Sequence, residues 1–305
     1  MRDKAEAMVQ CSFVADSLAL GVHWIYDTTQ LAAEHGRVED FLSPKKNPYH
    51  ANKEKGGFTH YGDQALVLLG SVSACNGFDL LDFSRRWQTL FKDYDGYLDE
   101  ATKGTLENFA MGKGPEHSGS PSSDLAGAAR ISPLFLCCRD NLDQLIAAVR
   151  SQTEMTHGDP LTVDSAEFFA RVAWKTLRGI APSVAVLEVV EERFSDSLIA
   201  EWTEKGLASK SEESISAIVH FGQSCHTSEA FPGVIHLIAK YEDELTEALI
   251  QAVMAGGDNA ARGMMVGMVL AAHLGKEQLP VQWVKGLEKA SEIRHLMDKV
   301  GTSTP

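Results

Sequence analysis

Apolar residues recur along the chain mainly at the spacing of α-helices. Between residues 4 and 20, Ala5, Val9, Phe13 and other apolar side chains fall on one helical face. Strict alternation over a strand length is scarce, and no Asn-Gly or Asp-Gly turn separates alternating runs. The pattern predicts one all-α domain over 1–305, a single compact multi-helix bundle with short connections. Besides 4–20, the helical period covers 64–75, 80–94, 98–110, 141–153, 162–178, 183–193, 195–206, 211–220, 228–240, 242–255, 259–274 and 287–299.

Two stretches lack this period and are predicted to be loops. Residues 34–62 are rich in Pro, Gly, Asn and Lys, and residues 111–124 are almost entirely Gly, Ser, Pro and polar. Long loops inside a compact domain are usually functional, although an exposed tip is an equal alternative for 111–124. Serines of this second loop are candidates to bind a phosphate, and we retain Ser123 and Asp124 as candidate substrate contacts.

Composition and charge restrict the classes of partner. Hydrophobic residues make up 44% of the chain, which supports a substantial core, and the formal net charge is −14. Such acidity argues against a nucleic-acid or membrane-surface partner, but allows a small phosphorylated ligand. The five cysteines form no CxxC pair, and the longest tempting apolar run, 263–274, is too short to span a membrane. We therefore expect reduced thiols in a cytoplasmic protein.

Three acids stand in or at the start of apolar helical segments. Asp63 lies in FTHYGDQALVLLGSV, Asp16 in VADSLALGVHWIYD, and Asp258 in AVMAGGDNAARGMMVGMVLAAHLG. A carboxylate at a helix N-terminus is commonly a cap, but several carboxylates gathered at buried helix ends usually hold a metal. Gly256 and Gly257 would let the backbone approach a ligand closely. We expect the three acids to converge on one central hollow.

These stretches together resemble the ADP-ribosylglycohydrolase family. That family includes the dinitrogenase-reductase-activating glycohydrolases, the ADP-ribosyl-acceptor hydrolases and the J1 crystallins. The similar segments are ADSLALGVHWIYD, GDQA at 62–65, and GGDNAARGMMVGMVLAAHLG at 256–275. Weaker similarity is found in ARISPL at 129–134 and THGDP at 156–160.

The resemblance implies a fold and a chemistry. It implies an all-α bundle of the ADP-ribosylglycohydrolase type with a cleft at its middle. In active members two Mg²⁺ or Mn²⁺ ions, held by acids and threonines of the second and third motifs, orient an ADP-ribose. The product is free ADP-ribose released from an acceptor, so the partner is a nucleotide-like small molecule or an ADP-ribosylated protein.

This chain departs from the family's metal motifs. The family's TDDT is replaced by GDQA at 62–65, and its DxDT by Asp258, Asn259, Ala260 and Ala261. Two of the four motif carboxylates remain. Their negative charge is too small to offset the repulsion between two divalent ions at close range. We therefore predict either one Mg²⁺ or Mn²⁺, bound between Asp63 and Asp258 with help from Gln64 and Asn259, or no ion.

Side chains of the protein offer an alternative to a metal. Arg262 or His60 are candidates to supply positive charge, and Asp63 with His60 or His157 would make an acid/base pair. His23 stands where hydrolases of the family carry a glutamate, as in the crystallin-like branch. We place Asp16 and His23 among the candidate substrate contacts.

Two hypotheses for the function follow. The first is a hydrolase of an N- or O-glycosidic ribosyl bond, with Asp63, Asp258 and His60 as catalytic candidates. The second is an inactive descendant that binds a nucleotide or serves as a structural protein. The lost metal ligands favour the second hypothesis. The polar groups kept at the N-termini of the helical segments that follow Asp63 and Asp258 favour the first.

Overall fold

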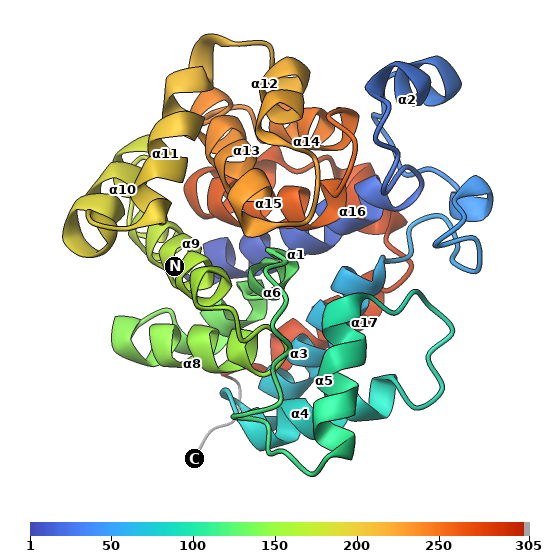
Figure 1. Ribbon diagram of the computed structural model, residues 1–305, viewed down its shortest axis with the longest axis vertical. Coiled ribbons are helices and arrows are strands. Elements are labelled where there is room, and N and C mark those ends of the chain that lie inside the picture. The colour runs from blue at the N-terminus through green and yellow to red at the C-terminus, as the bar shows by residue number, and fades with distance from the viewer. Residues whose placement is uncertain (302–305) are drawn as a thin grey trace.

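Helices are the main regular secondary structure of the described chain (Figure 1). The computed structural model describes residues 1–301, and this part of the chain contains no β-sheet, only isolated bridges such as Asp124 with His226. The predicted all-α class is therefore confirmed. The helices are α1 (Arg2–Leu20), α2 (Thr28–His35), α3 (His60–Cys75), α4 (Leu80–Leu90), α5 (Glu100–Ala110), α6 (Ala126–Ala129), α7 (Phe135–Cys138), α8 (Leu142–Glu154), α9 (Pro160–Leu177), α10 (Pro182–Val189), α11 (Leu198–Ala208), α12 (Ser214–Phe221), α13 (Thr227–Lys240), α14 (Leu245–Met254), α15 (Asn259–Leu274), α16 (Val281–Gly286) and α17 (Ala290–Lys299).

Helices α1 and α15 form the centre of the molecule (Figure 1). Every residue of α15 from Asn259 to Ala272 is buried. Its small residues allow a close approach to α1, because a Cβ built on Gly263 would lie 3.4 Å from the Cβ of Ala15. At Gly267 a Cβ would lie 2.9 Å from the sulfur of Cys11. The small residues of α15 therefore let it pack closely against α1.

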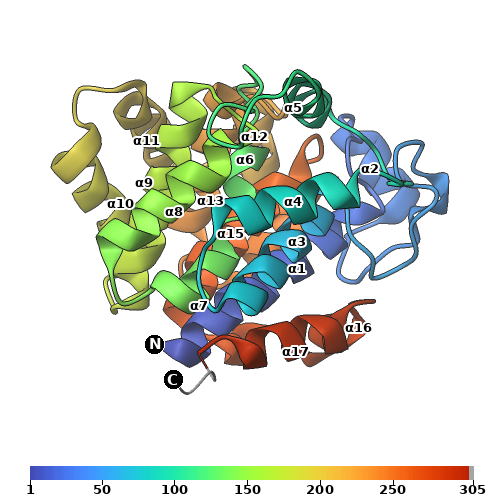
Figure 2. The same cartoon turned by 90° about the horizontal axis from the view of Figure 1, so that it is seen from below.

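Other helices pack around this pair in two groups. Helix α3 contacts α1, α4 and α17, and Figure 2 shows α16 and α17 together along one edge of the molecule. Helices α9, α13 and α14 contact α15 from other directions. As a result the N-termini of α3 and α15 are both held near the C-terminal end of α1. No helix within 1–301 combines the length and apolar character that crossing a membrane requires.

The observed helix ends correct several predicted boundaries. Helix α3 begins at His60, so 60–62 belong to it and not to the preceding loop. Its N-cap is Thr59, whose side chain accepts a hydrogen bond from the backbone N–H of Tyr61. The short helix α2 was not predicted, because it buries only Leu31 and so lacks an apolar face; Asp27 caps it. The loop 111–124 contains no helix, as predicted.

Candidate functional site

Asp258 is the N-cap of α15 and is almost fully buried. One of its carboxylate oxygens accepts from the backbone N–H of Ala261 at 3.4 Å. The other accepts from the hydroxyl of Tyr61 at 2.8 Å. The first turn of α3 therefore contacts the N-terminus of α15 through Tyr61. This contact supplies Asp258 with a neutral donor where the sequence analysis expected a metal ion or a charged side chain.

Gly256 and Gly257 allow two chain segments to meet in front of α15. Both have left-handed φ angles, +66° and +63°. A Cβ on Gly256 would lie 2.5 Å from the carbonyl oxygen of Ile25, and one on Gly257 would lie 2.3 Å from that of Gln223. The close approach expected here for a ligand is thus made by the chain itself.

Asp258 lies in a cluster with a second acid and a thiol. The potential ligand atoms of Asp124, Cys225 and Asp258, which we call the acid cluster, all lie within 4.8 Å of one another. Backbone hydrogen bonds bring the segments together, since the N–H of Leu125 donates to the carbonyl of Cys225 at 2.9 Å. The side chain of Asp124 also accepts from the N–H of Ala126 at 2.8 Å.

Burial makes it costly for both carboxyls of the acid cluster to ionise. Burial and then the charge of Asp258 raise the pKa of Asp124 well above its usual value. Burial also raises the pKa of Asp258, but the hydrogen bond from Tyr61 and the proximity of His60 act in the opposite direction. One proton is therefore best placed on Asp124, with the negative charge on Asp258.

Asp16 satisfies its buried carboxylate at the N-terminus of α3. It accepts from the backbone N–H of Thr59 at 2.8 Å, from the Thr59 hydroxyl at 2.5 Å and from the N–H of Gly62 at 3.2 Å. Burial raises the pKa of Asp16 to about 7, although the bonds from Thr59 oppose this. Asp16 thus joins α1 to α3, which gives it a structural partner in place of a ligand.

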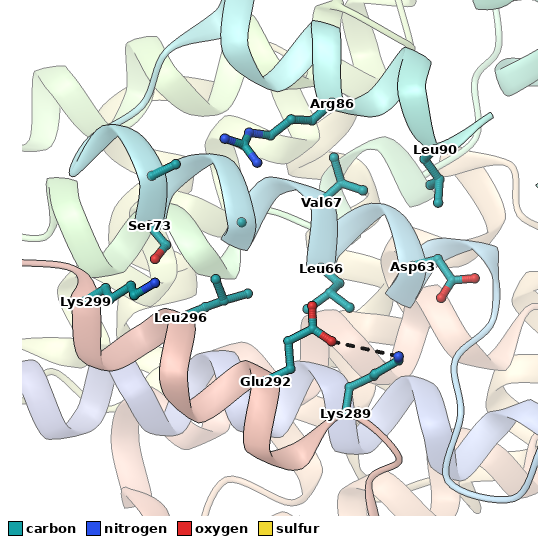
Figure 3. A pocket seen from close by; sticks show the side chains of 12 residues that line it. Asp63, Leu66, Val67, Ser73, Arg86, Leu90, Lys289, Glu292, Leu296 and Lys299 are labelled. Atoms are coloured by element: carbon teal, nitrogen blue, oxygen red, sulfur yellow. Dashed lines mark ion pairs between the residues drawn. The ribbon is translucent and has the colours of Figure 1, made fainter. Parts of the chain in front are cut away.

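Asp63 makes its contacts away from the acid cluster. Its carboxylate lies 2.5 Å from the ammonium of Lys53 and accepts from the hydroxyl of Tyr94 at 2.6 Å. It also lines a cavity of about 580 Å³ between α3, α4 and α17, which Figure 3 shows from close by. The expected pairing of Asp63 with Asp258 is therefore replaced by a pairing of Asp124 with Asp258.

The reason is the rotation of side chains around α3. Residues two positions apart on an α-helix point about 200° apart. Tyr61 faces the mouth of α15, so Asp63 is turned toward Lys53 and Tyr94. The motif residues of α3 consequently divide between two environments.

Three buried imidazoles lie beside the acid cluster. One ring nitrogen from each of His23, His50 and His60, which we call the histidine cluster, lies within 4.8 Å of the others. Nε2 of His60 is 3.2 Å from a carboxylate oxygen of Asp99, the N-cap of α5. Burial lowers the pKa of His23 to about 3 and that of His50 to about 2. His60 thus faces Asp99, and the expected acid/base pairing with Asp63 is not the contact it makes.

Gln64 and His157 belong to a buried network on the other side of α3. The side-chain oxygen of Gln64 accepts from Trp87 Nε1 at 2.8 Å and from Arg130 at 3.1 Å. His157 Nδ1 lies 2.8 Å from the hydroxyl of Thr156. Burial, followed by the charge of Arg130, lowers the pKa of His157 to about 3. Neither Gln64 nor His157 shares a hydrogen bond with the acid cluster within the described chain.

The remaining candidates frame the site. Ser123 is hydrogen bonded to Nδ1 of His226 at 3.0 Å, next to Asp124. Asn259 is 2.9 Å from His23 Nδ1 and so joins the mouth of α15 to the histidine cluster. Arg262 is buried and donates to the carbonyls of Ala252 and Gly256, and burial lowers its pKa to about 10. Its hydrogen bonds therefore stabilise the glycine turn, while its charge favours the ionised form of Asp258.

Four functional candidates were missed by the sequence analysis: Tyr61, Asp99, Cys225 and His50. Tyr61 directly precedes the second motif, and its signal was its position two residues before Asp63. Asp99 could have been found as the acid at the start of the helical period 98–110, which is where N-caps occur. Nothing local to Cys225 or His50 pointed to a site, because tertiary packing alone places them there.

The donors at the site do not fit the pair of hard divalent ions implied by the family resemblance. Asp16 uses its oxygens on backbone and hydroxyl donors, Asp63 is paired with Lys53, and one oxygen of Asp258 accepts from Tyr61. The acid cluster then offers two carboxylates and a thiol, whereas Mg²⁺ and Mn²⁺ prefer several oxygen ligands. At most one Mg²⁺ or Mn²⁺ stays our prediction for this site.

Comparison with known proteins agrees with the all-α architecture. The sequence is 26% identical to crystallin J1A of Tripedalia cystophora over 96% of this chain and 94% of that protein. It is 23% identical to ADP-ribosylhydrolase ARH3 of Mus musculus over 89% of this chain and 84% of that protein. A solved structure, an ADP-ribosylglycohydrolase-related protein complex, shares the fold with a TM-score of 0.76 at 21% identity, covering 98% and 97% of the two chains. Because the family model for ADP-ribosylglycohydrolase matches residues 1–304, the chain belongs to the ADP-ribosylglycohydrolase family.

Proposed function

We propose that this protein is a hydrolase of an N- or O-glycosidic ribosyl bond in ADP-ribose or a related nucleotide or nucleoside. Its substrate would be a small nucleotide-like molecule or an ADP-ribosylated protein, and residues 1–305 would act as one domain. The observation that carries the proposal is the buried pair Asp124 and Asp258, which lie in one cluster within 4.8 Å of each other. Family membership, with relatives named as ADP-ribosylhydrolases, supports the same reaction class.

A pair of carboxyls that shares one proton supports acid/base hydrolysis. Asp258, ionised and held by the Tyr61 hydroxyl, would take a proton from the attacking water. Asp124, which keeps its proton because its pKa is raised, would give that proton to the leaving acceptor atom. The bond between water oxygen and anomeric carbon forms as the glycosidic bond breaks. The result is a free ribosyl hydroxyl and a protonated acceptor.

A neighbouring cavity suits the nucleotide part of such a substrate. A cavity of about 340 Å³ is lined by Trp24, Tyr26, Tyr49 and other residues. Burial and the charge of Asp258 raise the pKa of Tyr26 to about 12, so this aromatic ring lies within electrostatic range of the acid cluster. We assign the aromatic lining to stacking against a base, and His23 also lines this cavity.

The test is release of free ADP-ribose from peptides that carry ADP-ribosyl-serine or ADP-ribosyl-arginine, measured by chromatography. We expect Asp124→Asn to lower kcat/KM by about 10²–10⁴-fold, the contribution typical of a general acid or base. Asp79→Asn is the matched control, because Asp79 is the exposed N-cap of α4 and Asn is an equally good cap. Activity that Asp124→Asn leaves intact would disprove the assignment.

A second candidate function is a non-catalytic role in nucleotide binding or structure. The observation in its favour is the hydrogen bond from Tyr61 to Asp258, which fills an oxygen that a metal or a water would need. Two of the relatives are named crystallins. ADP-ribose binding by calorimetry, with no turnover of any tested ADP-ribosyl peptide, would favour this role.

A further inference from the structure

We propose that His23, His50 and His60 form a binding site for one transition-metal ion of the Zn²⁺ type, separate from the acid cluster. The three side chains come from three parts of the chain: the turn after α1, the loop before α3, and the first residue of α3. One nitrogen from each lies within 4.8 Å of the others, and all three residues are at most 1% exposed.

The first argument is the number of buried nitrogens that have no hydrogen-bond partner. Four of the six ring nitrogens in this cluster lack any polar partner: Nε2 of His23, both nitrogens of His50 and Nδ1 of His60. Nε2 of His60 lies 3.2 Å from a carboxylate oxygen of Asp99 and is therefore not counted among them. Buried polar atoms in proteins are nearly always paired, so four such atoms in one place point to a missing ligand.

The second argument is that neighbouring groups orient two of the rings. The amide nitrogen of Asn259 faces the carbonyls of Val22 and Val253, so its oxygen faces Nδ1 of His23, at 2.9 Å. This arrangement puts the proton on Nδ1 and leaves the lone pair of Nε2 free. Asp99 stands beside one nitrogen of His60 in the same way, which is the carboxylate–histidine arrangement found behind metal ligands.

The third argument is the fixed position of His50. The side chain of Asn47 donates to the carbonyl of His23 at 2.9 Å, and the N–H of His50 donates to the carbonyl of Asn47 at 3.3 Å. The ring centroids of the cluster are 5.5 to 6.3 Å apart. Three imidazoles around one tetrahedral ion with bonds of about 2.0–2.1 Å have nitrogens about 3.4 Å apart, so modest side-chain rotations close the site.

The ligand set selects the kind of ion. Neutral imidazole nitrogens suit zinc, copper, cobalt or nickel, whereas Mg²⁺ and Ca²⁺ prefer oxygen. Three protein ligands leave a fourth position for water, as in catalytic zinc sites. Trp24 stacks on His23 with ring centroids 4.4 Å apart and lies against His50 and His60, so an aromatic wall shields the site.

The test uses the full chain, stripped with a chelator and then titrated with Zn²⁺ or Co²⁺ in the absence of substrate. We expect about one zinc per chain by elemental analysis, and a Co²⁺ visible spectrum of tetrahedral type. His50→Gln should weaken binding by at least about tenfold and abolish that spectrum. His50 forms no side-chain hydrogen bond, so this variant is expected to fold, and circular dichroism would verify it.

Two controls separate this site from others. His117→Gln removes an exposed histidine of the 111–124 loop and should leave zinc binding unchanged. Asp124→Asn with Cys225→Ser disables the acid cluster and should also leave it unchanged, even if hydrolysis is lost. Zinc binding that survives His50→Gln, or is lost with the acid-cluster variant, would overturn the proposal. So would a wild-type chain that binds no zinc.

Discussion

At the scale of single residues, the site depends on which way each side chain leaves its helix. Tyr61 and Asp63 are two positions apart on α3, yet the first binds Asp258 and the second binds Lys53 and Tyr94. The acid that looked catalytic in the sequence is thus one end of an ion pair with limited exposure. Its side chain is 18% exposed, so solvent screens that pair only in part.

Asp63→Ala is therefore expected to affect stability more than catalysis. Loss of hydrogen bonds to a charged partner typically costs about 1.5–3 kcal/mol, and partial exposure places this case at the lower end. Urea denaturation measures the stability change, and the ADP-ribose release assay measures turnover. A loss of kcat as large as that of Asp124→Asn, in a variant of unchanged stability, would restore Asp63 to the reaction.

At the scale of elements, the mouth of α15 is defined by a glycine turn. The N–H of Trp24 donates to the carbonyl of Gly257 at 3.0 Å, and the N–H of Asp258 donates to the carbonyl of Gln223 at 2.8 Å. These two bonds fasten segments from either side of the acid cluster onto α15. The turn therefore helps to position the acid cluster.

Gly257→Ala should disrupt this turn. The left-handed φ of +63° costs a residue with a Cβ about 1–2 kcal/mol, and contact with the Gln223 carbonyl adds to that cost. Gly70→Ala on α3 is the matched control: no atom lies within 4 Å of its Cβ, so helix propensity predicts a gain of up to about 1 kcal/mol. Equal melting temperatures for the two variants would contradict this account of the turn.

The sequence predicted the positions of the helices better than it predicted which residues lie next to each other in the fold. Helical periodicity located the long helices, because an apolar face must be buried wherever it is placed. Helix ends and the unusual loop 111–124 placed Asp258, Asp124 and His60 among the candidate residues, and their roles stay a prediction. The sequence did not predict that Asp124 and Cys225 would meet Asp258, because backbone pairing of 123–125 with 225–227 decides this.

At the scale of the whole molecule, buried acids and buried histidines set how stability depends on pH. Burial raises the pKa of Asp16, Asp124 and Asp258 and lowers that of His23, His50 and His157. The acids make the folded chain bind protons that the unfolded chain would release. The histidines do the reverse at pH values below about 6.5. Below about pH 6.5 the buried acids and the buried histidines therefore change stability in opposite directions, and above that pH only the buried acids contribute.

Asp16→Asn isolates one of these groups. The pKa of Asp16 rises from 3.8 in the unfolded chain to about 7 in the folded one, so its contribution is fully present below pH 3.8. As pH rises to 7, the stability of the wild type relative to the variant should fall by up to about 1.4 kcal/mol per pH unit. Denaturant unfolding of both proteins from pH 4 to 8 measures this difference. A difference that grew with pH would refute the sign.

The packing of α1 against α15 has a consequence for synthesis in the cell. Helix α1 emerges from the ribosome with its apolar residues uncovered, and α15, the helix that buries them, follows about 240 residues later. At about 5–20 residues per second, that interval lasts on the order of ten seconds or more. A nascent chain with this order of helices exposes apolar surface that chaperones can bind. A truncation before α15 would leave the apolar residues of α1 without the helix that buries them.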